Sequence, residues 1–168
     1  MEFTGHRVLR FSSGTSVGTI VAGNSTMGQD VTQLSFPSDV YLDLPTNSLI
    51  IVNYGLHNVV RWPLGASSWT FLGGSANNLP NSTSTSLNYP VGMTLDPMGN
   101  IYVADMRNHR IQLFLVDQLA GITIAGITGV VGSNATLLYR PQSVALDNQL
   151  NLYVADTYNH RIQRFLRY

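Results

Sequence analysis

The stretch Ile-Tyr-Val-Ala-Asp-Met-Arg-Asn-His-Arg-Ile-Gln-Leu-Phe at residues 101–114 decides the fold, because it recurs as Leu-Tyr-Val-Ala-Asp-Thr-Tyr-Asn-His-Arg-Ile-Gln-Arg-Phe at residues 152–165. A more divergent copy, Ile-Ile-Val-Asn-Tyr-Gly-Leu-His-Asn-Val-Val-Arg-Trp, occupies residues 50–62, and a truncated one, Gly-His-Arg-Val-Leu-Arg-Phe, occupies residues 5–11. The histidines mark the copies, since they lie at positions 6, 57, 109 and 160, at spacings of 51, 52 and 51 residues. A period of about 51 residues is typical of a propeller blade or a solenoid unit.

Each period contains short runs that are rich in β-branched and aromatic residues and are bounded by Gly, Asn, Asp or Pro, as strands are. Four such runs are residues 143–147, 101–104, 110–114 and 122–125, and no segment has convincing helical periodicity. Four antiparallel strands per repeat make a β-propeller blade. We therefore predict an all-β fold with about three propeller blades in a single domain. The repeats cover approximately residues 12–62, 63–114 and 115–165, with a partial repeat at 1–11.

The composition of the 168-residue chain excludes several classes of function. Hydrophobic residues make up 44% of the sequence, enough for a core, and the formal net charge is zero, which gives no generic affinity for nucleic acid or anionic membranes. The sequence has no lysine, which excludes Schiff-base chemistry and a Walker-type phosphate loop, and no cysteine, which excludes disulfides and zinc–thiolate sites. No apolar run approaches the length of a membrane span, so we predict no membrane insertion.

The Tyr-Val-Ala-Asp…Asn-His-Arg-Ile-Gln pattern resembles the NHL repeat, a family of β-propeller blades. The resemblance is strong at residues 89–114 and 139–165. It is weaker at 36–62, where Asn53 stands in place of the aspartate and Leu56 in place of the asparagine. The resemblance implies a propeller fold. It leaves the function open, because the family includes ligase substrate-binding domains, RNA binders, extracellular sensor domains and one lyase.

The polar residues of the repeated motif are interpreted as structural. Copies of one repeat position are spread around a ring, so they cannot converge on one metal ion or one reaction centre. We therefore predict no catalytic residues, no metal and no cofactor. The aspartates are expected to accept turn N–H groups and to pair with the neighbouring arginines, while the apolar residues of the third strand point inward. The structural residues are Asp105, Asn108, His109, Arg110, Asp156, Asn159, His160 and Arg161, and the inward apolar residues are Ile111, Phe114, Ile162 and Phe165.

The non-repeating loop positions are the better candidates for binding. In an antiparallel blade, the loop between the second and third strands shares a face with the loop leading into the next blade. Large amphipathic residues of the kind enriched in binding hot spots gather there. These candidates are Tyr54, Tyr89, Arg107, Arg140 and Tyr158.

Each loop between blades also carries an N-glycosylation sequon, at Asn24, Asn81 and Asn134. Together with the absence of cysteine and lysine, the sequons favour an extracellular setting, although the compartment itself stays open.

Three functions are compatible with these observations. The leading one is a non-enzymatic binding or scaffold module that presents the loop face to a protein, peptide or glycan. The alternative is an RNA-binding or ubiquitin-ligase substrate-recognition propeller, the ligase role needing a RING domain that this cysteine-free chain lacks. A lyase like the peptide-amidating enzyme is disfavoured, because it needs a metal held by non-equivalent histidines and every histidine here is a repeat position.

The length of the chain gives about three blades, whereas closed propellers have about four to eight. Residues 5–11 read as a third strand and residues 18–23 as a fourth, while the last repeat ends on its third strand. Two interpretations follow: the chain is part of a longer propeller, or two copies close head to tail into a six-bladed ring. The redundant third strand favours the first interpretation.

Overall fold

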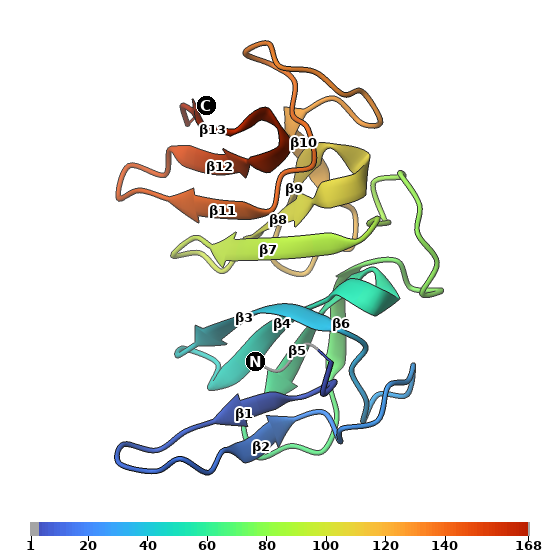
Figure 1. Cartoon of the computed structure of the whole chain (residues 1–168), viewed down its shortest axis with the longest axis vertical. Helices are drawn as coiled ribbons and strands as arrows, with labels where there is room; N and C mark the ends of the chain where they lie inside the picture. Colours follow the sequence, from blue (N-terminus) through green and yellow to red (C-terminus); the bar gives the residue numbers. More distant parts are fainter. Residues whose placement is uncertain (1–3, 168) are drawn as a thin grey trace.

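The computed structural model describes residues 4–167, and these form antiparallel sheets stacked side by side in an arc (Figure 1). Two sheets have four strands, one has three and one has two. Secondary structure other than strands is confined to three short 3-10 turns within the described range. The all-β, blade-based prediction is therefore confirmed.

The strands follow the repeats. The first sheet contains β1 (Val8–Arg10) and β2 (Thr19–Ala22). The second, blade 1, contains β3 (Pro37–Asp43), β4 (Ser48–Asn53), β5 (Asn58–Pro63) and β6 (Thr70–Gly74). The third, blade 2, contains β7 (Pro90–Leu95), β8 (Ile101–Asp105), β9 (Arg110–Phe114) and β10 (Ile122–Gly126). The last, blade 3, contains β11 (Ser143–Leu146), β12 (Leu152–Asp156) and β13 (Arg161–Phe165).

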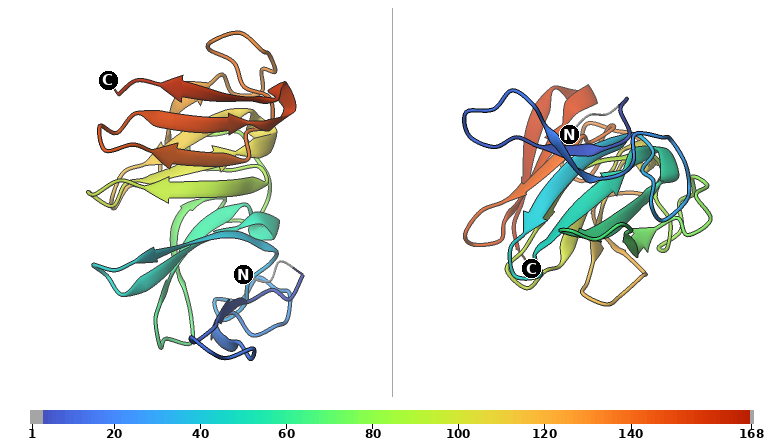
Figure 2. Two further views of the ribbon diagram at one scale, coloured as in Figure 1. Left: turned by 60° about the vertical axis from the view of Figure 1, so that its left-hand side comes forward. Right: turned by 90° about the horizontal axis from the view of Figure 1, so that it is seen from below.

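The hydrophobic core lies between neighbouring sheets, because each blade buries its apolar side chains against the next one. Figure 2 shows the sheets stacked as layers. Between blades 1 and 2 the cluster is built around Ile50, Val52, Val103 and Phe114, all of them buried. The Phe114 ring lies so close to Gly73 that a Cβ added there would come within 2.7 Å of it. Close packing of this kind fixes the angle between the two blades.

The first strands of successive blades, β3, β7 and β11, lie side by side along the inner edge of the arc. Two polar side chains of β3 fix this arrangement. The Ser38 hydroxyl donates to the carbonyl of Val91 (2.8 Å), and Asp39 accepts from the backbone N–H of Met93 (2.8 Å). Burial raises the pKa of Asp39, although the hydrogen bonds that its carboxylate accepts from the backbone N–H groups of Met93 and Val40 oppose the shift.

One expected core residue lies elsewhere. Ile111 is fully buried between blades 2 and 3, as predicted, but Ile162 at the same repeat position is 67% exposed. The difference arises because a fourth strand and the following blade cover Ile111, whereas β13 pairs with β12 alone. The sequence pattern identifies the repeat position of a residue, but it does not indicate which part of the structure packs against that residue.

Candidate functional site

Two kinds of loop meet at one end of every blade. The second and third strands are joined by the 3-10 turns η1 (Tyr54–Leu56), η2 (Met106–Asn108) and η3 (Thr157–Asn159), and the 3-10 turns project from one side of the arc (Figure 1). The loop leading into each blade lies against its turn, since the N–H of Tyr54, Arg107 and Tyr158 donates to the carbonyl of Phe36, Asn88 and Tyr139, respectively. We call this end of the molecule the turn face.

The backbone of the turn face is held in an uncommon conformation. The residue before each first-strand proline, or its equivalent, has a left-handed φ of 48° in Phe36, 51° in Tyr89 and 49° in Arg140. Non-glycine residues in this region cost free energy and persist only where the surroundings enforce them. Here a histidine enforces them, because each of the three N–H groups donates to the Nδ1 atom of the preceding blade's histidine.

These histidine contacts join neighbouring blades. The distances are 3.1 Å from Phe36 N to His6 Nδ1, 3.1 Å from Tyr89 N to His57 Nδ1 and 3.2 Å from Arg140 N to His109 Nδ1. An accepting Nδ1 requires a neutral imidazole. Burial, together with a nearby arginine charge, lowers the pKa of both His57 and His109, which favours that neutral form. His6, His57 and His109 therefore link neighbouring blades.

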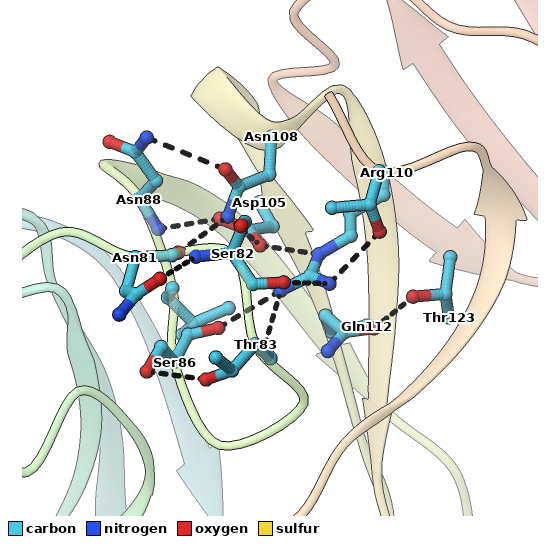
Figure 3. Close-up of polar contacts among 12 residues, drawn as sticks. Asn81, Ser82, Thr83, Ser86, Asn88, Asp105, Asn108, Arg110, Gln112 and Thr123 are labelled. Atoms are coloured by element: carbon cyan, nitrogen blue, oxygen red, sulfur yellow. Dashed lines mark hydrogen bonds and ion pairs between the residues drawn. The ribbon is translucent and has the colours of Figure 1, made fainter. Parts of the chain in front are cut away.

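Asp105 and Arg110 form a buried ion pair below η2 (Figure 3). Arg110 Nε lies 2.8 Å from Asp105 Oδ2, and its remaining N–H groups donate to the hydroxyl of Thr128 and to loop carbonyls of Ser82, Thr83 and Ser86. Asn108 donates to the same carboxylate at 2.8 Å. Burial raises the pKa of Asp105 to about 6, although Arg110 and the hydrogen-bond donors lower it. The Arg110 side chain thus connects blade 2 to three residues of the loop between blades 1 and 2.

The same network recurs in blade 3 and is absent from blade 1. Arg161 contacts Asp156 at 2.8 Å and also donates to the loop carbonyls of residues 133, 134 and 137, but its side chain is 29% exposed. In blade 1 the ion pair is replaced by Asn53 and Asn58, which are buried and leave Asn53 Nδ2 and Asn58 Oδ1 without a hydrogen-bond partner. The neutral pair reflects the divergence already visible in the sequence.

The structure corrects two details of these residues. The aspartates were expected to accept N–H groups of their own turn, yet Asp105 Oδ1 accepts from Asn88 N (2.7 Å) in the loop leading into the blade. The pairing of Arg110 with Asp105 was expected, but the burial of Arg110, which is 2% exposed, was not. Both differences have one cause: the carboxylate and the guanidinium together supply the hydrogen bonds that a buried loop backbone requires.

The five binding candidates come together in two clusters on the turn face. In blade 2 the Arg107 guanidinium lies 4.1 Å above the centre of the Tyr89 ring, which also contacts the Tyr54 ring at 4.8 Å. In blade 3 the Arg140 guanidinium lies 5.0 Å from the centre of the Tyr158 ring. We call these the Arg107 cluster and the Arg140 cluster.

Tyr139 also belongs to the Arg140 cluster and was not among the sequence candidates. Its ring lies 5.1 Å from Tyr158 and 5.7 Å from His109, so it connects the cluster to the preceding blade. Its repeat equivalents are Ser35 and Asn88, so the position varies as the other candidates do. This variation between repeats is the sequence signal that could have identified Tyr139 as a candidate.

Both clusters contain an arginine stacked on a tyrosine, but the two residue types exchange positions between blades 2 and 3. In blade 2 the residue before the proline is Tyr89 and the middle residue of the turn is Arg107, whereas in blade 3 they are Arg140 and Tyr158. In blade 1 the turn residue is Gly55, where a Cβ would come within 3.0 Å of the Phe36 ring. Each blade therefore packs a large side chain across the two loops, and two of them do so with an arginine on a tyrosine.

Other features of the surface are as follows. Asn24, Asn81 and Asn134 are exposed, and their glycosylation stays a prediction. A groove of about 510 Å³ lies at the opposite end, between hairpins of blades 1 and 2, and its lining includes Tyr41, Arg61 and Met98.

Across residues 4–167, no group of three His, Cys, Asp or Glu side chains is arranged to hold a metal ion. Nor does that range contain a helix long and apolar enough to span a membrane.

Comparison with solved structures defines the class of protein as a β-propeller. The chain resembles a structural genomics protein of unknown function from Bacteroides thetaiotaomicron (16% identity, TM-score 0.76, 97% of this chain and 42% of that one). It also resembles an auxiliary nutrient binding protein from the same organism (16% identity, TM-score 0.69, 96% and 43%) and a virginiamycin B lyase from Staphylococcus aureus (15% identity, TM-score 0.58, 99% and 50%). The chain thus spans half or less of the length of these structures, and at such identities the likeness shows the fold alone.

Comparison with sequence families gives a more specific result than the fold. The family described as NHL repeat matches residues 87–114 and 138–165, so the chain contains NHL repeats at these two positions, as the sequence pattern predicted. No curated protein sequence matches the chain.

Proposed function

We propose that the chain is a non-enzymatic binding module whose turn face binds a protein, peptide or glycan. The observation that carries the proposal is that the repeated residues and the non-repeating residues of that face have different roles. The repeated polar residues are engaged in links within and between blades, whereas the non-repeating tyrosines and arginines are held at the surface by a strained, well-braced backbone. Recognition residues on a rigid scaffold are typical of binding sites.

The likeness to an auxiliary nutrient binding protein agrees with a binding role, while the likeness to virginiamycin B lyase is the reason to test for catalysis. The proposal assigns no chemistry to the histidines, because their Nδ1 atoms are occupied by backbone N–H groups in three of the repeats.

The test uses arrays of peptides and glycans, followed by titration of the retained ligands. Tyr158→Ala and Arg107→Ala should each lower affinity at least tenfold while the thermal unfolding midpoint stays close to that of the wild type, since both residues are exposed. Tyr41→Ala is the matched control, because Tyr41 is 40% exposed and lines the groove at the opposite end. Unchanged affinity in the two turn-face variants would refute the proposal. RNA bound in a gel shift at a stated salt concentration would favour the RNA-binding alternative.

A further inference from the structure

The two stacked arginines of the turn face differ from the other arginines of the blades. Arg110 and Arg161 are bonded to carboxylates and to loop carbonyls. Within residues 4–167, by contrast, neither Arg107 nor Arg140 has a side-chain hydrogen bond or a carboxylate within ion-pair distance. Their guanidinium contacts are those with the tyrosine rings.

Stacking orders each guanidinium without using its N–H groups. Arg107 lies 4.1 Å from the centre of the Tyr89 ring, and Arg140 lies 5.0 Å from the centre of the Tyr158 ring and 5.9 Å from that of the Tyr139 ring. A guanidinium on an aromatic face keeps its planar fork of donors available at the edge. That fork matches a carboxylate, which accepts two parallel hydrogen bonds. Less side-chain freedom is lost on binding when the fork is already ordered.

The two guanidiniums belong to the stacked pairs of neighbouring blades, Arg107 from the turn of blade 2 and Arg140 from the loop leading into blade 3. Arg107 is close enough to His57 for its charge to contribute to the lowered pKa of that histidine, and Arg140 affects His109 in the same way. Both belong to the turn face, since Arg107 lies within η2 and Arg140 contacts Tyr158 of η3. We expect a ligand with carboxylates along an extended chain to reach both.

We propose that the ligand of the turn face is an acidic peptide segment whose carboxylates are bound by Arg107 and Arg140. This inference rests on the proposed function and names the chemistry of its ligand. A peptide is favoured over a sugar or an RNA because pyranose rings and bases bind by stacking on open aromatic faces. Here guanidinium groups already lie against the Tyr89 and Tyr158 rings. RNA binding also relies on contacts to many phosphates, whereas two unpaired guanidiniums supply two.

The experiment compares acidic peptides, their Gln and Asn counterparts, oligogalacturonate and single-stranded RNA on the full chain. The acidic peptides should bind and their amide counterparts should not. Arg107→Gln and Arg140→Gln should each weaken binding by about ten- to a hundredfold, the range expected for a hydrogen-bonded charge pair. Arg107→Lys should restore only part of the loss, because lysine keeps the charge and lacks the fork. Arg164→Gln, an exposed arginine on β13, is the charge-matched control and should leave affinity unchanged.

A second readout separates direct contact from a change in folding. A carboxylate bound to Arg140 neutralises the charge that helps to lower the pKa of His109, so saturating peptide should raise that pKa in an NMR titration of the wild type. The inference is overturned if peptides bind regardless of acidity, if oligogalacturonate or RNA is bound in their place, or if the glutamine variants bind as the wild type does. When Tyr158→Ala still weakens binding of a peptide or glycan, those outcomes leave the proposed function intact, whereas RNA bound in place of the peptides would favour the RNA-binding alternative. If no ligand of any class depends on the turn face, both proposals are wrong.

Discussion

Replacing Arg110 by methionine tests the role assigned to the repeated Asp–Arg pair. The substitution keeps the aliphatic stem and removes every hydrogen bond of a guanidinium whose side chain is 3% exposed, beside a carboxylate that is fully buried. Breaking a buried pair by removing one partner costs about 3 to 5 kcal/mol, because the other charge is left buried and unpaired. For a chain of this size, the unfolding midpoint should fall by about 6 to 20 °C.

Two further variants sharpen this prediction. Arg161→Met removes the same bonds in blade 3, where the side chain is 29% exposed and water can replace them, so it should cost about 1 to 2 kcal/mol. Asp105→Asn combined with Arg110→Met leaves no buried charge and should recover part of the loss.

The pH dependence has a defined sign. The pKa of Asp105 in the folded chain, about 6, already lies above its unfolded value of 3.8, and loss of Arg110 raises it further. The folded state then binds more protons than the unfolded state over this window, so the free energy of unfolding of Arg110→Met falls as pH rises from about 4 through the raised pKa. Urea denaturation at several pH values measures this. Equal costs for Arg110→Met and Arg161→Met, or a double variant no more stable than Arg110→Met, would refute the reasoning.

Two other predictions concern the histidine links between blades and the packing of a glycine within blade 2. Because the pKa values of His57 and His109 are lowered below 6.5 in the folded chain, the stability they contribute is present above pH 6.5 and lost as pH falls through the lowered values. The double variant with His57→Asn and His109→Asn should flatten that loss in acid denaturation, since asparagine tolerates the left-handed backbone and does not titrate there. Gly126→Ala should cost about 2 kcal/mol or more in thermal unfolding, because φ is +78° and the added Cβ would lie 2.3 Å from the carbonyl of His109. Gly129→Ala, with φ of +74° and nothing within 4 Å, should cost about 1 kcal/mol, and equal effects would contradict the packing argument.

Much of the fold could be predicted from the sequence because the repeat supplies its own comparison. The third strand of blade 2 was predicted at 110–114 and is observed at Arg110–Phe114. The strand at 143–147 is observed at Ser143–Leu146. The exposure of Ile162 could not be predicted, since it depends on what packs beyond β13 and not on the residue itself.

That the candidate residues share one face could be predicted from the sequence, whereas their contacts could not. The antiparallel topology places Tyr89, Arg107, Arg140 and Tyr158 on one face, which a strand count anticipates. The exchange of arginine and tyrosine between blades 2 and 3 becomes visible only when the loops are placed against each other. The burial of Arg110 was also missed, because hydrophobicity patterns treat arginine as a surface residue, whereas its five donors can satisfy a buried loop backbone.

Ligand recognition is assigned here to the turn face. Backbone and side-chain NMR of the full chain, titrated with a peptide that binds, tests it most directly. The largest shifts should cluster at Tyr89, Arg107, Arg140 and Tyr158, with little change at the opposite end around Tyr41 and Met98. Shifts concentrated in the groove lined by Tyr41 and Met98, with the turn face silent, would contradict this assignment.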